Sequence, residues 1–275
     1  MTLGPLVDGA WLTAHLGEPD LVVVDMRWYL GRPGDGEAAY LAGHIPGAVF
    51  CDVDGPINGR GPGRHPLPGR EQFQAAMREL GVHKGDRVVA YDDAGGSIAA
   101  RLWFLLRYFG HAGVAVLDGG LQAWSGELEA GPVRRPAGDF SAAEPRKEWV
   151  LSFDDVRRLP PGQILIDARA RERYTGEVEP TGVPAGHIPG ARSAPWAANL
   201  GAGRRFRSPA ELRRHFEALG ADGSNTVAYC GSGVTATHDL LALEIAGLPG
   251  GRLYEGSWSE WAVRPDAEIR TGEDP

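Results

Sequence analysis

The chain has 275 residues, 43% of them hydrophobic and 23% charged, which is typical of a globular protein and excludes a disordered one. The formal net charge of −8 argues against a nucleic-acid partner, because phosphate binding needs a surplus of lysine and arginine on one face. No apolar run approaches the roughly 18 residues that cross a bilayer, and residues 1–5 lack the pattern of a secretory signal. We therefore expect a cytoplasmic protein without a membrane partner, of one large domain or two ordinary ones.

In the first half of the chain, short apolar runs alternate with segments of helical length. The run at 22–24 leads into Asp25, and Arg87–Tyr91 is a second run of strand length. Residues 98–109 predict a helix, and Gly110 provides its C-terminal cap. Residues 131–147 are rich in proline, glycine, alanine and charge and lack an apolar period, so they predict a linker.

The second half has the same order of elements. Residues 164–168 and Thr226–Tyr229 predict buried strands. Ser208 and Pro209 predict the start of a helix, because serine caps free N–H groups and proline fits the first helical position. Residues 234–246 predict another helix. Strands that alternate with helices imply a mostly parallel sheet with helices on both faces, so the predicted fold class is α/β.

The two halves repeat one another. The seven residues at 42–48, Ala-Gly-His-Ile-Pro-Gly-Ala, recur unchanged at 185–191. Three more pairs of segments match in the same order, each displaced by roughly 140 residues. They are 22–27 with 164–169, 89–92 with 227–230, and 117–124 with 254–261. The repeat predicts tandem domains at 1–130 and 148–275, joined by the linker at 131–147.

A loop that contains two glycines follows the strand ending at Tyr229. Sites in open α/β sheets form at the carboxyl ends of strands, where helix N-termini add partial positive charge. The glycines let successive N–H groups curl inwards into an anion-binding concavity, which can stabilise a thiolate, a persulfide or an oxyanion. The loop consists of Cys230, Gly231, Ser232, Gly233, Val234 and Thr235. We predict that Cys230 is a nucleophile.

The repeat provides a control for this prediction. The first copy has Asp92 where the second has Cys230, so only the C-terminal domain can carry out thiol chemistry. The alternative for Cys230 is a small buried hydrophobic residue at a strand end. That is our prediction for Cys51, which follows the apolar pair Val49 and Phe50.

These motifs resemble those of the tandem-domain rhodaneses. The resemblance rests on the paired Gly-His-Ile-Pro-Gly-Ala segments, on the Asp-Gly-Gly and Glu-Gly-Ser turns that precede Trp124 and Trp261, and on the loop after Cys230. The loop is similar to that of the 3-mercaptopyruvate sulfurtransferase branch, since thiosulfate-preferring members carry basic residues where this chain has Gly231 and Ser232. The resemblance implies two rhodanese-like domains, the first inactive and the second active.

The resemblance also implies roles for single residues. In this family an arginine shortly after the first strand of the active domain binds the donor's anionic group, and Arg173 stands there. The mercaptopyruvate branch has a serine–histidine–aspartate set, for which this chain offers Ser232 with His65 and Asp54, eleven residues apart. The loop residues expected to contact substrate are Gly231, Gly233, Val234 and Thr235.

One position departs from the family pattern. The mercaptopyruvate branch has a second arginine after Glu-Pro, and this chain has Thr181 instead. The candidates to replace that arginine are Arg192, Arg204 and Arg205. His44 and His187 occur in both copies, which predicts a structural role, such as bonding backbone at a turn, rather than a catalytic one.

The predicted activity is transfer of sulfur from 3-mercaptopyruvate, or from thiosulfate, through a persulfide on Cys230. The acceptor would be a thiol, thioredoxin or cyanide, and no metal or organic cofactor is required. A phosphatase of related fold would need an arginine to close the loop, and residues 234–237 contain none. A non-catalytic binding module is the other alternative, although it would not need Cys230.

Overall fold

The structure is a computed structural model that describes residues 3–275. Met1 and Thr2, which begin both the predicted first domain and the segment without a secretory signal, lie outside the described residues. The chain forms two compact units. The first contains the residues up to Gly59 with Leu67–Arg146 and Ala202–Phe206, and the second contains Arg60–Pro66, Lys147–Gly201 and Arg207–Pro275. Over the described range, no helix is long and apolar enough to cross a membrane.

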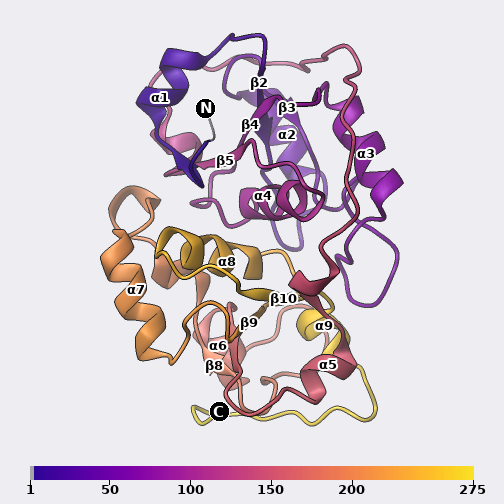
Figure 1. Ribbon diagram of the computed structural model, residues 1–275, viewed down its shortest axis with the longest axis vertical. Coiled ribbons are helices and arrows are strands. Elements are labelled where there is room, and N and C mark those ends of the chain that lie inside the picture. Colours follow the sequence, from indigo (N-terminus) through magenta and orange to yellow (C-terminus); the bar gives the residue numbers. More distant parts are fainter. Residues whose placement is uncertain (1–2) are drawn as a thin grey trace. The chain divides into compact units, whose positions relative to one another are not determined.

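The first unit is built on a sheet with the strand order β1-β5-β4-β2-β3, in which the neighbouring strands are parallel (Figure 1). Its elements are β1 (Leu6–Val7), α1 (Gly9–His15), β2 (Leu21–Asp25), α2 (Asp35–Ala42), β3 (Val49–Phe50), α3 (Arg70–Glu79), β4 (Arg87–Tyr91), α4 (Ala99–Tyr108), β5 (Val114–Leu117) and the 3₁₀ helices η1 (Gly120–Ala123) and η4 (Ala202–Arg204). The strand predicted at Arg87–Tyr91 is confirmed. The helix predicted at 98–109 is confirmed to within one residue at each end, and Gly110 follows it with a φ of 84°.

The second unit repeats this topology, with the strand order β6-β10-β9-β7-β8 and parallel pairing. Its elements are η2 (Lys147–Trp149), β6 (Val150–Leu151), α5 (Phe153–Arg157), β7 (Ile164–Asp167), α6 (Arg171–Thr175), β8 (Arg192–Ser193), η3 (Trp196–Asn199), α7 (Pro209–Ala218), β9 (Thr226–Tyr229), α8 (Ala236–Ile245), β10 (Arg252–Tyr254) and α9 (Ser257–Trp261). The matching strand orders confirm two copies of one α/β fold.

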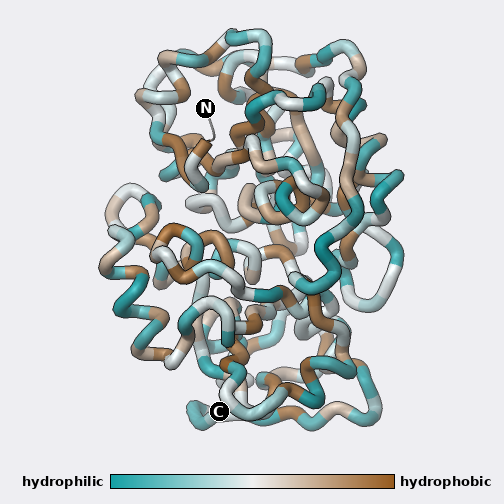
Figure 2. Tube along the Cα trace, in the orientation of Figure 1, coloured by the Kyte–Doolittle hydropathy of each residue, from teal (hydrophilic) through white to brown (hydrophobic). Residues whose placement is uncertain are grey.

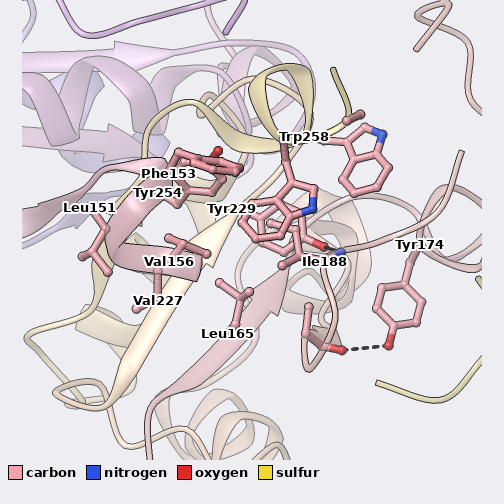
Figure 3. Packing of buried hydrophobic residues seen from close by; sticks show 13 residues of the cluster. Leu151, Phe153, Val156, Leu165, Tyr174, Ile188, Val227, Tyr229, Tyr254 and Trp258 are labelled. Atoms are coloured by element: carbon pink, nitrogen blue, oxygen red, sulfur yellow. Dashed lines mark hydrogen bonds between the residues drawn. The ribbon is translucent and has the colours of Figure 1, made fainter. Parts of the chain in front are cut away.

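Both faces of the second sheet are buried. Alternate residues of a strand point to opposite faces, so Leu165, Val227 and Tyr229 share one face. There they pack in a cluster with residues of α5 and α9, including Phe153 and Trp258 (Figure 3). On the other side of the strands, α8 packs against β9 and β10, and α7 packs against α8 (Figure 1). Elements packed on both faces of the sheet therefore hold the carboxyl end of β9 in place.

The ends of α7 and α8 bear out one sequence prediction and correct another. Ser208 and Glu211 form a capping box at the start of α7, and Pro209 takes the first helical position, as predicted. The tube of α7 is largely hydrophilic in Figure 2, and this helix buries only Leu212 and Phe216. The start of α8 was predicted at residue 234 but lies at Ala236, because residues 231–234 are still part of the loop.

The repeated sequence motifs have a structural role in each unit. In the first, Arg27 pairs with Asp25 at 2.6 Å and donates to the carbonyl of Gly43 at 2.8 Å. In the second, Arg169 pairs with Asp167 and donates to the carbonyl of Gly186 at 2.7 Å. These buried pairs tie β2 and β7 to the Gly-His-Ile-Pro-Gly turns of their units.

The two histidines of these turns bond to backbone, as the sequence predicts. Nδ1 of His44 lies 2.8 Å from the carbonyl oxygen of Tyr40, and Nδ1 of His187 lies 2.8 Å from that of Tyr174. Each imidazole also stacks on the ring of the same tyrosine. Both histidines are fully buried, which agrees with a structural role.

The segment predicted as a linker packs against the first unit over most of its length. Residues 131–146 contain no helix or strand. Phe140 is nevertheless buried, its N–H donates to the carbonyl of Val82, and the N–H of Gly138 donates to the carbonyl of Arg78. By its contacts, the segment up to Arg146 therefore belongs to the first unit.

Candidate functional site

The loop at Cys230 is held by the turn that begins α9. Cys230 follows β9 directly and is 1% exposed. Its N–H donates to Oγ of Ser257 at 3.1 Å, and its carbonyl accepts the N–H of Trp258 at 2.9 Å. The N–H of Ser259 donates to the carbonyl of Gly231 at 2.9 Å. The turn thus fixes the peptide groups on both sides of the cysteine.

Ser257 adopts a strained conformation to make its contact. Its φ of 51° lies in the left-handed region, which is unusual for a residue other than glycine. Its hydroxyl donates to the carbonyl of Tyr254 at 2.9 Å and so has an oxygen lone pair directed at the N–H of Cys230. Strain of this kind persists only where the surrounding structure determines it, and here it positions the end of β9.

Gly233 is required by the shape of the loop. Its φ is 78°, and a Cβ at this position would lie 2.6 Å from the carbonyl oxygen of Glu255. No other residue fits without moving the α9 turn. The next loop residue, Val234, is buried, and its carbonyl accepts the N–H of Thr237 at 3.1 Å. Thr235 is half-buried and occupies the cap position of α8.

The equivalent loop of the first unit binds a carboxylate. Asp92 is fully buried and accepts four backbone N–H groups, those of Ala94, Gly96, Ile98 and Ala99, at 2.7–2.9 Å. Burial raises the pKa of Asp92, while these four donors favour its charged form. A loop of this fold can therefore surround an anion with backbone N–H groups, and in the first copy the chain's own side chain fills it.

His65 lies against the cysteine loop of the second unit. The contacts of Arg60–Pro66 assign this segment to the second unit, although it precedes that unit's first strand by more than 80 residues. Nδ1 of His65 is 2.7 Å from Oγ of Ser232, and the two residues are 1% and 4% exposed. A buried imidazole and a hydroxyl at this distance can exchange a proton. The structure therefore brings His65 and Ser232 together two residues after Cys230.

Arg173 lies over Gly231 and is oriented by Glu179. Nη2 of Arg173 donates to both carboxylate oxygens of Glu179, at 2.7 and 2.9 Å, and Nε donates to one of them at 3.2 Å. A Cβ placed on Gly231 would lie 3.3 Å from both Nη atoms of Arg173. Glu179 also pairs with Arg169 at 3.3 Å. The side chain of Arg173 is therefore an oriented cation at the loop, not a solvated charge.

The charge of Glu179 depends on these partners. Burial acts to raise the pKa of Glu179, but hydrogen bonds from Thr181 and Arg173 outweigh it, so the pKa lies below its ordinary value. A depressed folded-state pKa adds stability that is present above the unfolded value of about 4.3 and is lost as the pH falls through the folded value.

Replacing Glu179 by glutamine should flatten this pH dependence. We expect the free energy of unfolding of the wild type to fall more steeply below about pH 4.3 than that of Glu179→Gln. At pH 7 the variant should be the less stable protein, because Arg169 and Arg173 lose a buried anionic partner. Urea unfolding over a pH series measures both effects. Glu172→Gln, at an exposed position of the same segment, is the control, and equal slopes for Glu179→Gln and the wild type would contradict the assignment.

The remaining predicted residues lie in the first unit. Asp54 is exposed, and Nε1 of Trp28 donates to its Oδ2 at 2.5 Å. Cys51 is 1% exposed, and burial with the nearby Asp52 raises the pKa of its thiol to about 12. A thiol that stays protonated at neutral pH is a poor nucleophile. These properties favour the structural role that the sequence predicts for Cys51.

The structure places the three arginines that were candidates to replace the one missing at position 181. Arg192 donates to the carbonyl of Leu219, at the end of α7. Arg204 donates to the carbonyl of Asp93 at 2.7 Å, and Arg205 packs beside Gly119, both within the first unit. The guanidinium groups of Arg192 and Arg204 are thus each bonded to a backbone carbonyl.

An arginine that the sequence analysis did not single out lies at the loop instead. Nη2 of Arg64 is 3.4 Å from Oγ of Ser232 and 3.6 Å from the position of a Cβ on Gly231. Its position next to His65 in the sequence is the signal that could have identified it. The loop therefore combines a thiol, a hydroxyl–imidazole pair and two guanidinium groups, which can act as nucleophile, proton-transfer pair and anion-binding groups.

Comparisons with known proteins show what the chain is similar to. The sequence model of the rhodanese-like domain family matches the chain twice, at residues 8–127 and 152–264. A Pseudomonas aeruginosa protein named "Probable 3-mercaptopyruvate sulfurtransferase" is 42% identical over 285 aligned residues, which cover 99% of this chain and all of that protein. An Arabidopsis thaliana protein named "Thiosulfate/3-mercaptopyruvate sulfurtransferase 2" is 34% identical over 96% of this chain and 86% of its own length.

A solved structure has the same fold. The crystal structure of SseA from Escherichia coli, described as a 3-mercaptopyruvate sulfotransferase with the rhodanese fold, matches with a TM-score of 0.82. The match has 37% sequence identity and covers 94% of this chain and all of the SseA chain.

Proposed function

The chain is a sulfurtransferase of the rhodanese-like family, and on this premise we propose that it moves sulfur from 3-mercaptopyruvate to a thiol acceptor through a persulfide on Cys230. The observation that carries the choice of donor is the 2.7 Å contact between His65 and Ser232, two residues after the cysteine. Such a pair is useful when the leaving group needs a proton.

In the first step, the Cys230 thiolate attacks the sulfur of 3-mercaptopyruvate. A sulfur–sulfur bond forms, the donor's carbon–sulfur bond breaks, and the electron pair of that bond stays on the departing pyruvate enolate. The product on the enzyme is a persulfide. The N–H groups of Gly231, Gly233, Val234 and Thr235 would stabilise the anionic sulfur, a role supported by the four N–H groups that surround Asp92 in the first copy.

The enolate is a strong base and takes a proton to become pyruvate. We propose that the proton comes from Ser232, with His65 exchanging it through Nδ1. Asp54 is the third member of this set by the resemblance to the mercaptopyruvate branch. The eleven-residue spacing from His65 supports that part of the proposal.

In the second step, an acceptor attacks the outer sulfur of the persulfide. The sulfur–sulfur bond breaks, the sulfur leaves with the acceptor, and the Cys230 thiolate is restored. A small thiol, thioredoxin or cyanide would serve as acceptor. Neither step requires electrons from a metal or an organic cofactor.

The competing proposal is that thiosulfate is the main donor. The name of the Arabidopsis relative includes thiosulfate as well as 3-mercaptopyruvate. The test is kcat/KM for 3-mercaptopyruvate and for thiosulfate, measured with one common acceptor. A higher value for mercaptopyruvate supports the proposal, and a higher value for thiosulfate overturns the choice of donor.

We assign Arg173 to binding of the donor's anionic group. Arg173→Ala should raise KM for an anionic donor about 10- to 100-fold, because a hydrogen bond to a charged group contributes about 1.5–3 kcal/mol. Steady-state kinetics with either donor measures this change. The control is Arg171→Ala on the same helix, where the arginine is exposed and pairs with Glu273. Unchanged kinetics in Arg173→Ala would leave the residue with a structural role only.

The two copies of the repeat have different roles in this proposal. We propose an inactive N-terminal domain at 1–130, a linker at 131–147 and an active domain at 148–275, because Asp92 fills the loop of the first copy. His65 is the exception, since it precedes the linker in sequence but belongs to the second unit by its contacts. The two free cysteines, Cys51 and Cys230, support a location in the reducing cytoplasm.

A further inference from the structure

We infer that Ser259 is a positioning residue for the proton-transfer step, because it holds the segment that carries His65 in register with the loop that carries Ser232. The inference rests on the proposed function, since it adds a residue to the machinery of that reaction. Ser259 acts through the backbone beside each member of the pair rather than on the donor itself.

The backbone of Ser259 holds the cysteine loop. Its N–H donates to the carbonyl of Gly231 at 2.9 Å. That carbonyl belongs to the planar peptide group directly before Ser232, so the bond fixes where the backbone of Ser232 begins. Because the donor is a main-chain group, this bond does not depend on which side chain stands at position 259.

The side chain of Ser259 holds the segment of His65. Its Oγ accepts the N–H of Arg64, the residue directly before the histidine, at 2.9 Å. A serine hydroxyl has one hydrogen, and here it donates that hydrogen to the carbonyl of Gly256 at 3.1 Å. The oxygen therefore has a lone pair left for the incoming N–H, and the bond has a fixed direction.

Two features prevent His65 from adjusting independently of this bond. Gly63 packs against the same hydroxyl, since its φ is 82° and a Cβ there would lie 3.2 Å from Oγ of Ser259. Pro66 follows the histidine, and a proline restricts the preceding residue to extended backbone conformations. A displacement of Arg64 would therefore be passed on to the imidazole.

The proton-transfer pair tolerates only a small displacement. Proton transfer needs heavy atoms within about 2.6–3.2 Å of each other. Nδ1 of His65 lies 2.7 Å from Oγ of Ser232, so a shift of the segment by about 1 Å would take the pair outside that range. Because Ser259 bonds the backbone beside each member, it limits such a shift.

The neighbouring Ser257 acts on a different group. Its Oγ accepts the N–H of Cys230 at 3.1 Å, so it positions the nucleophile, which both donors need. The hydroxyl of Ser259 serves only the proton step, which 3-mercaptopyruvate requires and thiosulfate does not. The inference therefore predicts that loss of this hydroxyl affects one donor and spares the other.

The experiment compares Ser259→Val with Ser259→Thr, two side chains of the same shape of which only threonine has a hydroxyl. For Ser259→Val we expect kcat with 3-mercaptopyruvate to fall about 10- to 100-fold, the effect of a displacement of about 1 Å. The solvent deuterium isotope effect on this turnover should increase, because proton transfer becomes slower. Turnover of thiosulfate should change much less, and Ser259→Thr should retain most of the wild-type rate with both donors. Ser224→Ala, at an exposed serine of the same unit, is the control and should match the wild type.

A second measurement does not depend on turnover. The imidazole ¹⁵N resonances of His65 report the hydrogen bond at Nδ1. In Ser259→Val they should move towards those of Ser232→Ala, which lacks the bond, whereas Ser259→Thr should keep the wild-type resonances. Circular dichroism and thermal unfolding establish that each variant is folded.

Two outcomes would overturn the inference. One is an equal loss of kcat with both donors in Ser259→Val, which would make Ser259 a support of the whole cysteine loop. The other is that the valine and threonine variants agree in rate and in the resonances of His65, so that the hydroxyl has no role. Failure of the proposed function is a separate result, since the wild type would then not turn over 3-mercaptopyruvate. The resonances still test the position of His65 in that case.

Discussion

Cys230→Ser should abolish sulfur transfer from either donor, reducing it to the uncatalysed background. A serine hydroxyl at this position cannot take up sulfane sulfur, so no persulfide can form and no later step can compensate. Initial rates with 3-mercaptopyruvate and with thiosulfate measure the loss. After donor treatment of the wild type, mass spectrometry should find one additional sulfur atom on the peptide that contains Cys230.

Cys51→Ser is the matched control for this experiment. Cys51 is as deeply buried as Cys230, but its thiol has a pKa raised to about 12 and it follows a short strand of the first unit. We expect transfer by this variant to remain near the wild-type rate. Sulfur found on the peptide of Cys51, or transfer that survives in Cys230→Ser, would refute the assignment of the nucleophile.

Ser232→Ala and His65→Ala should lower kcat with 3-mercaptopyruvate by roughly 10²- to 10⁴-fold, the usual loss for a general acid–base group. The enolate of pyruvate needs a proton as it leaves, and Ser232, two residues after Cys230, forms a buried pair with His65. Sulfite leaves thiosulfate as a stable anion, so turnover of that donor should change much less. Parallel measurements of kcat with both donors give the ratio that tests this explanation.

Two further variants sharpen this comparison. Asp54→Asn should reduce mercaptopyruvate turnover if the carboxylate belongs to the same set. His83→Ala, at an exposed histidine of the first unit, should have no effect on either donor. Equal losses with both donors in Ser232→Ala would assign the pair a structural role and would make thiosulfate the better candidate for the natural donor.

The amino-acid sequence by itself determined the architecture and singled out Cys230 as the candidate nucleophile. Local patterns carry this information, because each can be recognised from a short stretch of sequence. They are the strand-length apolar runs, helix caps such as Ser208 with Pro209, and the glycines around Cys230. The repeat adds a comparison within the chain, which separates Cys230 from Asp92. The start of α8 was placed two residues too early, because Gly233 and Val234 continue the loop into a segment that has helical composition.

Only the tertiary structure decided which side chains surround the loop. His65 reaches Ser232 from 167 residues away, and no periodicity or motif encodes a contact over that distance. Arg64 and Arg173 face the same glycine because the α9 turn fixes one through Ser259 and Glu179 orients the other. Such convergence depends on how separate segments pack on a common core, and packing is a property of the whole fold rather than of any stretch of sequence.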